Sequence, residues 1–459
     1  MTSDDTTLDA SAPWLEVDAL IDDPRTRIVV CCGSGGVGKT TTAAALGVRA
    51  AERGRKVVVL TIDPARRLAQ SMGISELDNV PRRVKGVDET AGGELHAMML
   101  DMKRTFDEIV EGHADAERAR AILENPFYQS LSAGFAGTQE YMAMEKLGQL
   151  RAGDDWDLIV VDTPPSRSAL DFLDAPKRLG SFLDGKFIRV LMAPAKVGGR
   201  AGMKFLNVGM SMMTGTLSKL MGGQLLRDVQ TFVAAMDTMF GGFRTRADAT
   251  YRLLQAPGTA FLVVAAPERD ALREAAYFVE RLAAEQMPLA GLVLNRVHGS
   301  GAAQLSAERA LAAAEALTED FADRAPEDAE PPQEPYDDLN SPSSEAGSSS
   351  AENLEPDGIV DLAGGKTGSR TPGGSSPAAA EQAASPPASA AQLAAGLLRL
   401  HAERMQVLAR ERRTRDRFTA LHPEVPVTEV GALPGDVHDL AGLRAIGDRL
   451  VLRPGKTEA

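Results

Sequence analysis

Cysteine is almost absent from this sequence of 459 residues, since only Cys31 and Cys32 occur. The two are adjacent in a run that predicts a β-strand, where neighbouring side chains point to opposite faces. A disulfide framework is therefore excluded, and a metal site built on thiolates has little support.

The sequence also lacks the segments that mark membrane and secreted proteins. It has no run of about 18 apolar residues, so no helix is expected to span a bilayer unaided. The N-terminal stretch MTSDDTTLDASAPWLEVDALIDD is acidic and has neither the basic nor the apolar region of a signal peptide. We therefore expect a cytoplasmic protein that reaches a membrane only through a partner.

The excess of acidic over basic residues lies mainly in one segment, where basic residues are scarce. The net charge is −14, and residues 315–357 alone hold fourteen acidic residues and one base, Arg324, which is a net of −13. The remainder is close to neutral, so we expect no nucleic-acid partner bound through phosphate contacts. Residues 401–418 contain six arginines, but interspersed acidic residues are typical of a solvated helix face.

Composition divides the chain into four parts. Residues 1–24 are expected to form an N-terminal tail, and residues 25–317 an α/β domain that residues 390–459 complete. Residues 318–389 are rich in Ser, Pro, Gly, Ala and Glu and poor in aromatic and branched residues. They predict a disordered insert, which is either a regulatory tether or an expanded surface loop.

Short branched-apolar runs alternate with longer helical patterns outside the insert. The runs are Arg27–Cys32, Lys56–Thr61, Asp157–Val161, Thr259–Ala265, Ala290–Leu294 and Val427–Val430. Such alternation predicts an α/β fold with a doubly wound, mostly parallel sheet that is covered on both faces. Residues 75–153 and 176–255 are predicted to be helical excursions that form a helical subdomain.

One segment fits the phosphate-loop pattern G-x-x-x-x-G-K-[ST] between a predicted strand and a predicted helix. Its residues are Gly33, Ser34, Gly35, Gly36, Val37, Gly38, Lys39 and Thr40. The glycines let backbone N–H groups turn toward phosphate oxygens, and the helix N-terminus adds positive potential. Lys39 is expected to reach the β- and γ-phosphates and Thr40 to ligate Mg²⁺, with Thr41 also in contact with the nucleotide. ATP and Mg²⁺ are the expected cofactors.

Two aspartates end other predicted strands. Asp162 follows the apolar run 158–161 and is predicted to hold Mg²⁺ through water, although an aspartate before Pro164 could also cap a turn. Asp63 ends the second strand. Because ligands bind at the carboxyl ends of strands in open sheets, we expect Asp63 to face the γ-phosphate and orient the attacking water.

Together these elements resemble the arsenite-pump ATPase and tail-anchored-protein targeting ATPase family of dimerising P-loop ATPases. The family's switches, D-P-A-H-x-L and D-T-A-P-T-G-H-T-L, correspond to residues 63–68 and 162–170. Residues 137–140 are similar to its P-G-x-x-E element, Asn295 to an asparagine that contacts adenine, and residues 429–443 to the segment that closes over the base. The resemblance implies a P-loop NTPase domain and a dimer whose opening and closing follow ATP binding and hydrolysis.

The chain departs from the family's pattern at several positions. The signature lysine that crosses a closed dimer is Ser34 here, the histidine of the first switch is Arg66, and the Gly-His of the second is Arg167-Ser168. The proline expected under adenine corresponds to Gly431. Neither the zinc-binding nor the arsenite-binding cysteines of relatives are present, so an arsenite-activated subunit is disfavoured.

Methionine is concentrated in one region, since eight of the seventeen methionines lie between Met192 and Met239. Flexible, polarizable methionine surfaces suit binding of varied apolar helices. By position this segment resembles the helical region with which targeting factors bind a client's transmembrane helix. The alternative is that these residues pack a helical core or a dimer interface.

Three functions follow from these features. The first is an ATP-switched dimer, formed with itself or with a paralogue, that handles a hydrophobic helix client or a membrane protein. The second is a nucleotide-binding regulatory subunit, which Ser34 favours and the intact Lys39, Asp63 and Asp162 disfavour. The third is the ATPase subunit of an anion transporter. We favour a heterodimer with a lysine-bearing paralogue, because the other hydrolytic residues are retained.

Overall fold

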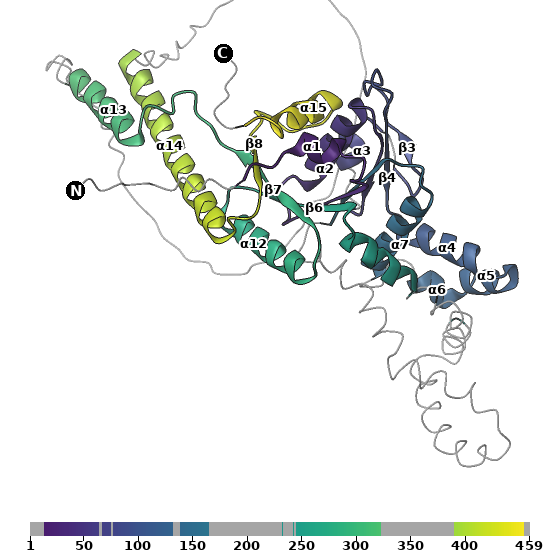
Figure 1. Ribbon diagram of the computed structural model, residues 1–459. Coiled ribbons are helices and arrows are strands. Elements are labelled where there is room, and N and C mark those ends of the chain that lie inside the picture. Colours follow the sequence, from purple (N-terminus) through teal and green to yellow (C-terminus); the bar gives the residue numbers. More distant parts are fainter. Residues whose placement is uncertain are drawn as a thin grey trace, which may run out of the picture. The chain divides into compact units, whose positions relative to one another are not determined.

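The computed structural model describes residues 13–63, 67–74, 77–131, 138–164, 245–322 and 390–453, together with residues 232 and 242. Its centre is an eight-stranded sheet in the order β3-β4-β2-β5-β1-β6-β7-β8 (Figure 1). The strands are β1 (Ile28–Cys32), β2 (Lys56–Thr61), β3 (Arg82–Arg83), β4 (Glu94–Met99), β5 (Leu158–Asp162), β6 (Thr259–Ala265), β7 (Leu289–Val297) and β8 (Val427–Gly431). Only β3 and β4 pair antiparallel within this sheet of described residues. The predicted mostly parallel α/β sheet is confirmed.

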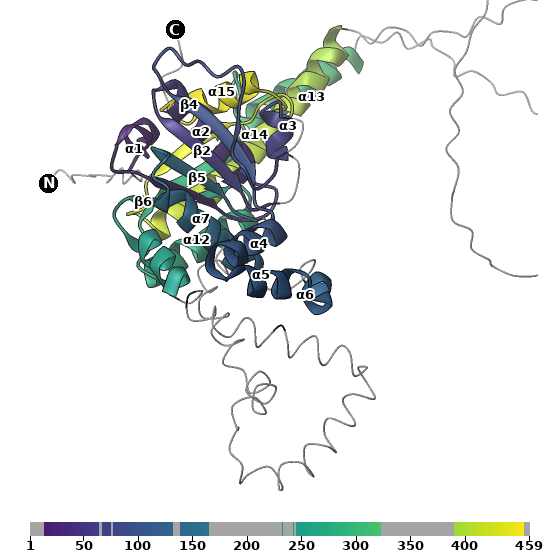
Figure 2. The same cartoon turned by 90° about the vertical axis from the view of Figure 1, so that its right-hand side faces the viewer.

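Helices cover both faces of the sheet, as Figures 1 and 2 show. The helices that the structure describes anywhere in the chain are α1 (Val17–Asp22), α2 (Lys39–Glu52), α3 (Arg67–Ser71), α4 (Met102–His113), α5 (Ala116–Leu123), α6 (Pro126–Leu131), α7 (Thr138–Ala152), α12 (Arg269–Ala284), α13 (Ala307–Ala322), α14 (Ala390–Leu421) and α15 (Leu440–Arg449). Val30 and Cys32 pack in the core that contains α7 and α12, whereas Val29 and Cys31 pack in the core that contains α2 and α15. The two cysteines therefore lie on opposite faces, as the strand pattern predicts.

The structure differs from the sequence prediction within residues 75–153, where helices were expected throughout. β3 and β4 precede α4 in this segment, and β4 pairs in parallel with β2 along its whole length. The sequence of β4, Glu-Leu-His-Ala-Met-Met, has no β-branched residue, so local propensity does not predict a strand. Of the second predicted helical excursion, 176–255, the structure describes residues 232, 242 and 245–255, and the last of these ranges is helical.

Residues 13–24, which the sequence analysis assigned to an N-terminal tail, pack against the sheet. Trp14 forms a parallel bridge with Val427. The Val427 N–H donates to the Pro13 carbonyl oxygen at 2.8 Å, and the Leu15 N–H donates to the Val427 carbonyl oxygen at 3.2 Å. α1 then buries Val17 and Ile21. The segment covers part of the edge strand β8, whose backbone groups would otherwise be open to pairing with another chain.

Residues Leu305–Glu403 form a compact unit of their own. Its two helical segments, α13 and the first part of α14, bury small side chains, namely Ala310, Ala314, Ala395 and Ala402. α13 continues to Ala322, past the predicted start of the insert at residue 318, and residues 323–389 lie outside the described part of the chain. No helix that the structure describes, α14 included, combines the length and apolar character needed to cross a membrane.

Candidate nucleotide-binding site

The predicted phosphate loop joins the carboxyl end of β1 to the first turn of α2. Gly33 has a φ of +149°, and a Cβ there would lie 2.1 Å from the carbonyl oxygen of Val264 on β6. Gly38, the residue before α2, has a φ of +94°, and a Cβ there would lie 2.2 Å from Asn295 Nδ2 on β7. Both positions therefore require glycine. Any other residue would be strained at a positive φ, and its Cβ would overlap a neighbouring atom.

Lys39 is buried at the start of α2. Its Nζ donates a hydrogen bond of 2.8 Å to the Ser34 carbonyl oxygen, and this is its only hydrogen bond among the described residues. An ammonium group has three donors, so two remain for an anionic ligand. Burial lowers the pKa of Lys39, and the neighbouring Asp162 carboxylate acts in the opposite direction.

Asp162 ends β5 and is fully buried beside the loop. The hydroxyls of Thr40 and Thr61 both donate to its Oδ2, at 2.8 and 2.9 Å. Its Oδ1 is also buried but has no hydrogen-bond partner in the described part of the chain. Burial raises the pKa of Asp162 to about 6, against the opposing effects of the two hydroxyls and Lys39. Buried carboxylate oxygens nearly always have a partner, so Oδ1 is suited to a ligand that the chain itself does not supply.

The donor set around Asp162 fits Mg²⁺. Thr40 Oγ1 and the Asp162 carboxylate are hard oxygen donors that lie one hydrogen bond apart. Mg²⁺ takes only one or two protein ligands in such sites and fills its octahedron with water and phosphate oxygens. The two donors come from α2 and from β5, and the pairing of Cys31 with Asp162 sets the register between β1 and β5.

Asp63 follows the neighbouring strand β2, at the same edge of the sheet as Asp162. Thr61 pairs with Asp162 in the register of β2 and β5, and Ile62 N donates to the Asp162 carbonyl oxygen at 2.9 Å. The Asp63 side chain is half-buried, and its charge is one of those that act on Lys39. Lys39, Asp63 and Asp162, which sequence patterns predicted separately, therefore lie at one sheet edge.

Two threonines that the sequence analysis did not single out connect these strands. Thr61 donates to Asp162, and its hydroxyl also accepts from Asp63 N at 3.2 Å. Thr163 donates to the Cys31 carbonyl oxygen at 2.9 Å, which joins the end of β5 to β1 just before the loop. The sequence signal for both is a hydroxyl residue within two positions of a predicted site aspartate at a strand end.

Asn295 supports the loop from the β7 side. The side chain is 7% exposed, and its Nδ2 donates to the Val37 carbonyl oxygen at 2.8 Å. This contact accounts for the close approach of Asn295 to Gly38. The predicted contact of Asn295 with adenine stays a prediction.

The remaining predicted positions fall into two groups. Arg66, Arg167, Ser168 and residues 192–239, apart from residue 232, lie outside the described residues. Gly431 is described and ends β8, where Arg449 of α15 donates to its carbonyl oxygen at 2.7 Å.

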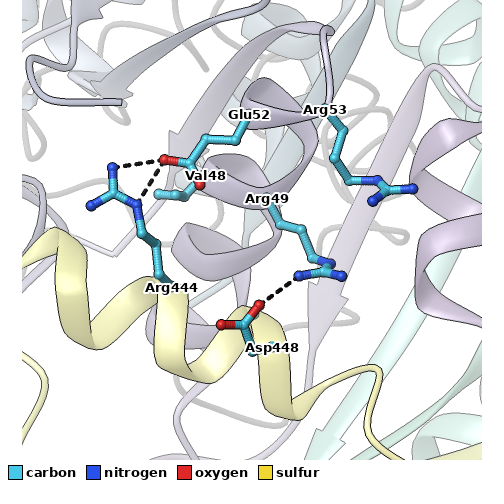
Figure 3. Close-up of a pocket in the computed structure, with 7 residues that line it drawn as sticks. Val48, Arg49, Glu52, Arg53, Arg444 and Asp448 are labelled. Atoms are coloured by element: carbon cyan, nitrogen blue, oxygen red, sulfur yellow. Dashed lines mark hydrogen bonds and ion pairs between the residues drawn. The ribbon is translucent and has the colours of Figure 1, made fainter. Parts of the chain in front are cut away.

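α15 packs along α2 through ion pairs around a cavity of about 80 Å³. Figure 3 shows Arg444 of α15 directed at Glu52 of α2, at 2.7 Å, and Arg49 of α2 directed at Asp448 of α15, at 2.9 Å. Both carboxylates and both guanidinium groups are thus paired. This contact joins the helix that begins at Lys39 to the helix at the end of the segment predicted to close over the base.

Comparison with known proteins assigns most of the chain to a family of ATPases. The family model for anion-transporting ATPases matches residues 26–323. An ATPase GET3 from Podospora anserina is 25% identical over 306 residues, which are 66% of this chain and 82% of that protein. An ATPase GET3 from Malassezia globosa is 29% identical over 179 residues, 39% of this chain and 50% of that protein.

A putative arsenical pump-driving ATPase from Halobacterium salinarum is 32% identical over 206 residues, 42% of this chain and 30% of that protein. The chain therefore spans most of the Podospora relative but half or less of the other two. The family model covers well over half of the chain and includes the phosphate loop, Asp63, Asp162 and Asn295. The chain belongs to the anion-transporting ATPase family.

Proposed function

We propose that this chain binds MgATP at the phosphate loop, Asp63 and Asp162, and that it hydrolyses ATP to ADP and phosphate. Its family and its relatives are ATPases, which supports the general activity. The observation that carries the proposal is the buried Oδ1 of Asp162, without a hydrogen-bond partner in the described chain. The other oxygen of this carboxylate, Oδ2, accepts a hydrogen bond from Thr40, and the carboxylate lies within the electrostatic reach of Lys39.

Each residue of the site would have a separate role in binding and hydrolysis. Lys39 would exchange its bond with the Ser34 carbonyl for bonds with β- and γ-phosphate oxygens, because charged acceptors form the stronger hydrogen bonds. Thr40 and Asp162 would hold Mg²⁺, which when bound neutralises charge that develops on the phosphates. Asp63 is half-buried just beyond the end of the neighbouring strand β2 and would orient the attacking water and accept its proton.

Three substitutions test this assignment. Lys39→Ala and Asp162→Ala should each abolish tight MgATP binding, measured by calorimetry, while the circular dichroism spectrum stays that of the wild type. Asp63→Asn should bind MgATP but lose turnover, because only the water-orienting group changes. Asp270→Asn, at an exposed carboxylate on α12, is the matched control and should change neither quantity. Wild-type turnover in Asp63→Asn would remove its assigned role, and tight binding by Lys39→Ala would refute the site.

We further propose that the chain works as one half of an ATP-controlled dimer, with a paralogue as the favoured partner. Ser34 is 8% exposed and carries no charge. A cation supplied in trans to the γ-phosphate is worth about 10³–10⁵ in rate in related phosphoryl-transfer systems. A partner whose loop carries a lysine at this position would complete the site of this chain.

A regulatory subunit with little hydrolysis of its own is the second candidate, because Ser34 favours it as well. Steady-state ATPase rates of the chain alone and with a lysine-bearing paralogue from the same cell separate the cases. A gain of about tenfold or more that disappears when the partner's lysine becomes alanine supports the heterodimer. A homodimer of this chain that already hydrolyses ATP as fast as the assembly with the paralogue refutes the heterodimer. MgATP binding with no turnover in either assembly supports the regulatory subunit.

The same proposal includes a client, the molecule that the ATP-controlled dimer binds. We propose that the client is a hydrophobic helix or a membrane protein, which the dimer binds from the cytoplasm, and the composition of the methionine-rich segment 192–239 supports this. Changing Met210, Met212 and Met213 together to serine should impair capture of an apolar helix while solubility is kept. Aggregation of this variant would instead support a packed core. An anion-transporter subunit would show ATPase stimulation by an anion rather than by a helix.

A further inference from the structure

Arg296, near the carboxyl end of β7, has a backbone conformation that arginine rarely adopts. Its φ is +61°, in the left-handed region. Among the described residues three non-glycine residues have a positive φ, namely Asp154, Gln286 and Arg296, and Arg296 alone lies within a strand. Residues held in this region persist only where the surrounding structure determines them, and they gather at functional sites.

A β-bulge accounts for this conformation. In the pairing of β7 with β8, Asn295 and Val297 have consecutive partners, Val430 and Gly431, so Arg296 is the extra residue. Leu294 and Val297 both pack in the core that contains α12, three positions apart, whereas an unbroken strand would return to that face at position 296. The bulge therefore removes Arg296 from the core face and leaves it exposed. Bulges beside active sites re-aim side chains in this way.

Arg296 directly follows the residue of β7 that contacts the phosphate loop. The preceding residue, Asn295, bonds the Val37 carbonyl oxygen at 2.8 Å. Within the part of the chain that the structure describes, the Arg296 guanidinium forms no hydrogen bond or ion pair. An unpaired planar cation thus follows directly on the residue that holds the phosphate loop.

The order of the strands indicates which end of a nucleotide would reach Arg296. Asp162 on β5 and Asp63 beyond β2 lie on one side of β1, whereas β6 and β7 lie on the other. Adjacent strands are about 4.8 Å apart, so β7 lies roughly 10 Å from β1. A nucleoside triphosphate whose terminal phosphate lies at Asp63 and Asp162 would extend across the loop toward β7. The group near Arg296 would then be the base, and the phosphates would lie on the opposite side.

We propose that the guanidinium of Arg296 stacks on the purine base of the bound nucleotide and determines much of the site's affinity for the base. This inference rests on the proposed function, because it takes the phosphate loop to bind a nucleoside triphosphate. A guanidinium is planar and weakly hydrated and stacks well on aromatic faces. Because stacking uses the face of the base and not its edge, Arg296 should favour adenine and guanine about equally.

The test uses Arg296→Gly in the full chain, since glycine adopts a positive φ without strain. We expect Arg296→Gly to weaken the binding of MgATP and MgGTP about three- to tenfold in calorimetry. Binding of magnesium tripolyphosphate, which has no base, should not change. The Tm without nucleotide should stay the same or rise by up to about 2 °C, because backbone strain is relieved. Gln286→Gly makes the same backbone change at an exposed position after α12 and should leave all affinities unchanged.

Each outcome decides a separate claim. Weaker nucleotide binding with intact tripolyphosphate binding and an intact Tm supports the stacking role. Unchanged MgATP affinity, or an equal loss of tripolyphosphate affinity, overturns it while the proposed function stands. A wild-type protein that binds neither MgATP nor tripolyphosphate overturns the proposed function itself. A loss of Tm in Arg296→Gly would show that arginine stabilises the bulge, and it would overturn the inference.

Discussion

Replacing Asp162 with asparagine should change how the stability of the nucleotide-free protein depends on pH. Burial raises the pKa of Asp162 from 3.8 to about 6, so between these values the folded protein keeps a proton that the unfolded chain has released. The stability from this group is fully present below the unfolded pKa and is lost as the pH rises through the folded pKa. The two pKa values give a loss of roughly 1.5 kcal/mol between pH 5 and pH 8.

An asparagine at position 162 does not titrate in this range. The free energy of unfolding of the wild type minus that of Asp162→Asn should therefore fall by roughly 1.5 kcal/mol between pH 5 and pH 8. Titrating groups that do not interact with Asp162 cancel in this difference. Urea unfolding at four pH values, with magnesium and nucleotide absent, measures the difference.

The control for this experiment is Asp270→Asn, because the side chain of Asp270 is 79% exposed. Its difference from the wild type should stay nearly constant over the same pH range. If the wild type and Asp162→Asn give parallel curves, then Asp162 titrates in the folded protein as it does in the unfolded chain. That result would refute both the argument from burial and the significance given to Oδ1.

Two further substitutions test the packing around the site. Gly38→Ala should lower the free energy of unfolding by about 2–3 kcal/mol, because its Cβ would meet Asn295 Nδ2 at 2.2 Å and φ is +94°. Gly73→Ala, with a φ of +65° and no atom within 4 Å, should cost only about 1 kcal/mol, so equal costs would rule out the clash. Arg444→Met should cost no more than about 1 kcal/mol in urea unfolding, because its pair with Glu52 is partly exposed, and a larger loss would mean that α15 depends on this pair.

The central strands could be predicted from the sequence because each is a continuous apolar run. β1, β2, β5, β6 and β8 lie within one residue of their predicted bounds, and β7 is longer than predicted at both ends. A strand buried on both faces needs apolar residues at every position, which separates it clearly from the helices around it. β4 could not be predicted in this way, because only its pairing with β2 distinguishes Glu-Leu-His-Ala-Met-Met from a helix.

Local patterns identified the charged residues of the site, but not what holds them. Lys39 belongs to a loop motif, and Asp63 and Asp162 follow apolar runs, so each is recognisable within a few positions. The contact between Asn295 and Val37 joins residues 258 positions apart, and no local pattern contains it. The bulge at Arg296 likewise depends on the register of β7 against β8. Residue identity is local information, whereas register and hydrogen-bond partners arise only when distant strands meet.

The charges of Lys39 and Asp162 explain why metal and nucleotide should bind this site as a unit. Burial lowers the pKa of the lysine and raises that of the aspartate, so in both cases it disfavours the charged form. A triphosphate stabilises the charged lysine but repels the aspartate, and a divalent cation does the reverse. Bound together, they stabilise both charged forms and also attract each other. The titration of Asp162 should therefore be visible only while magnesium and nucleotide are absent, because a bound cation holds the carboxylate ionised through the same pH range.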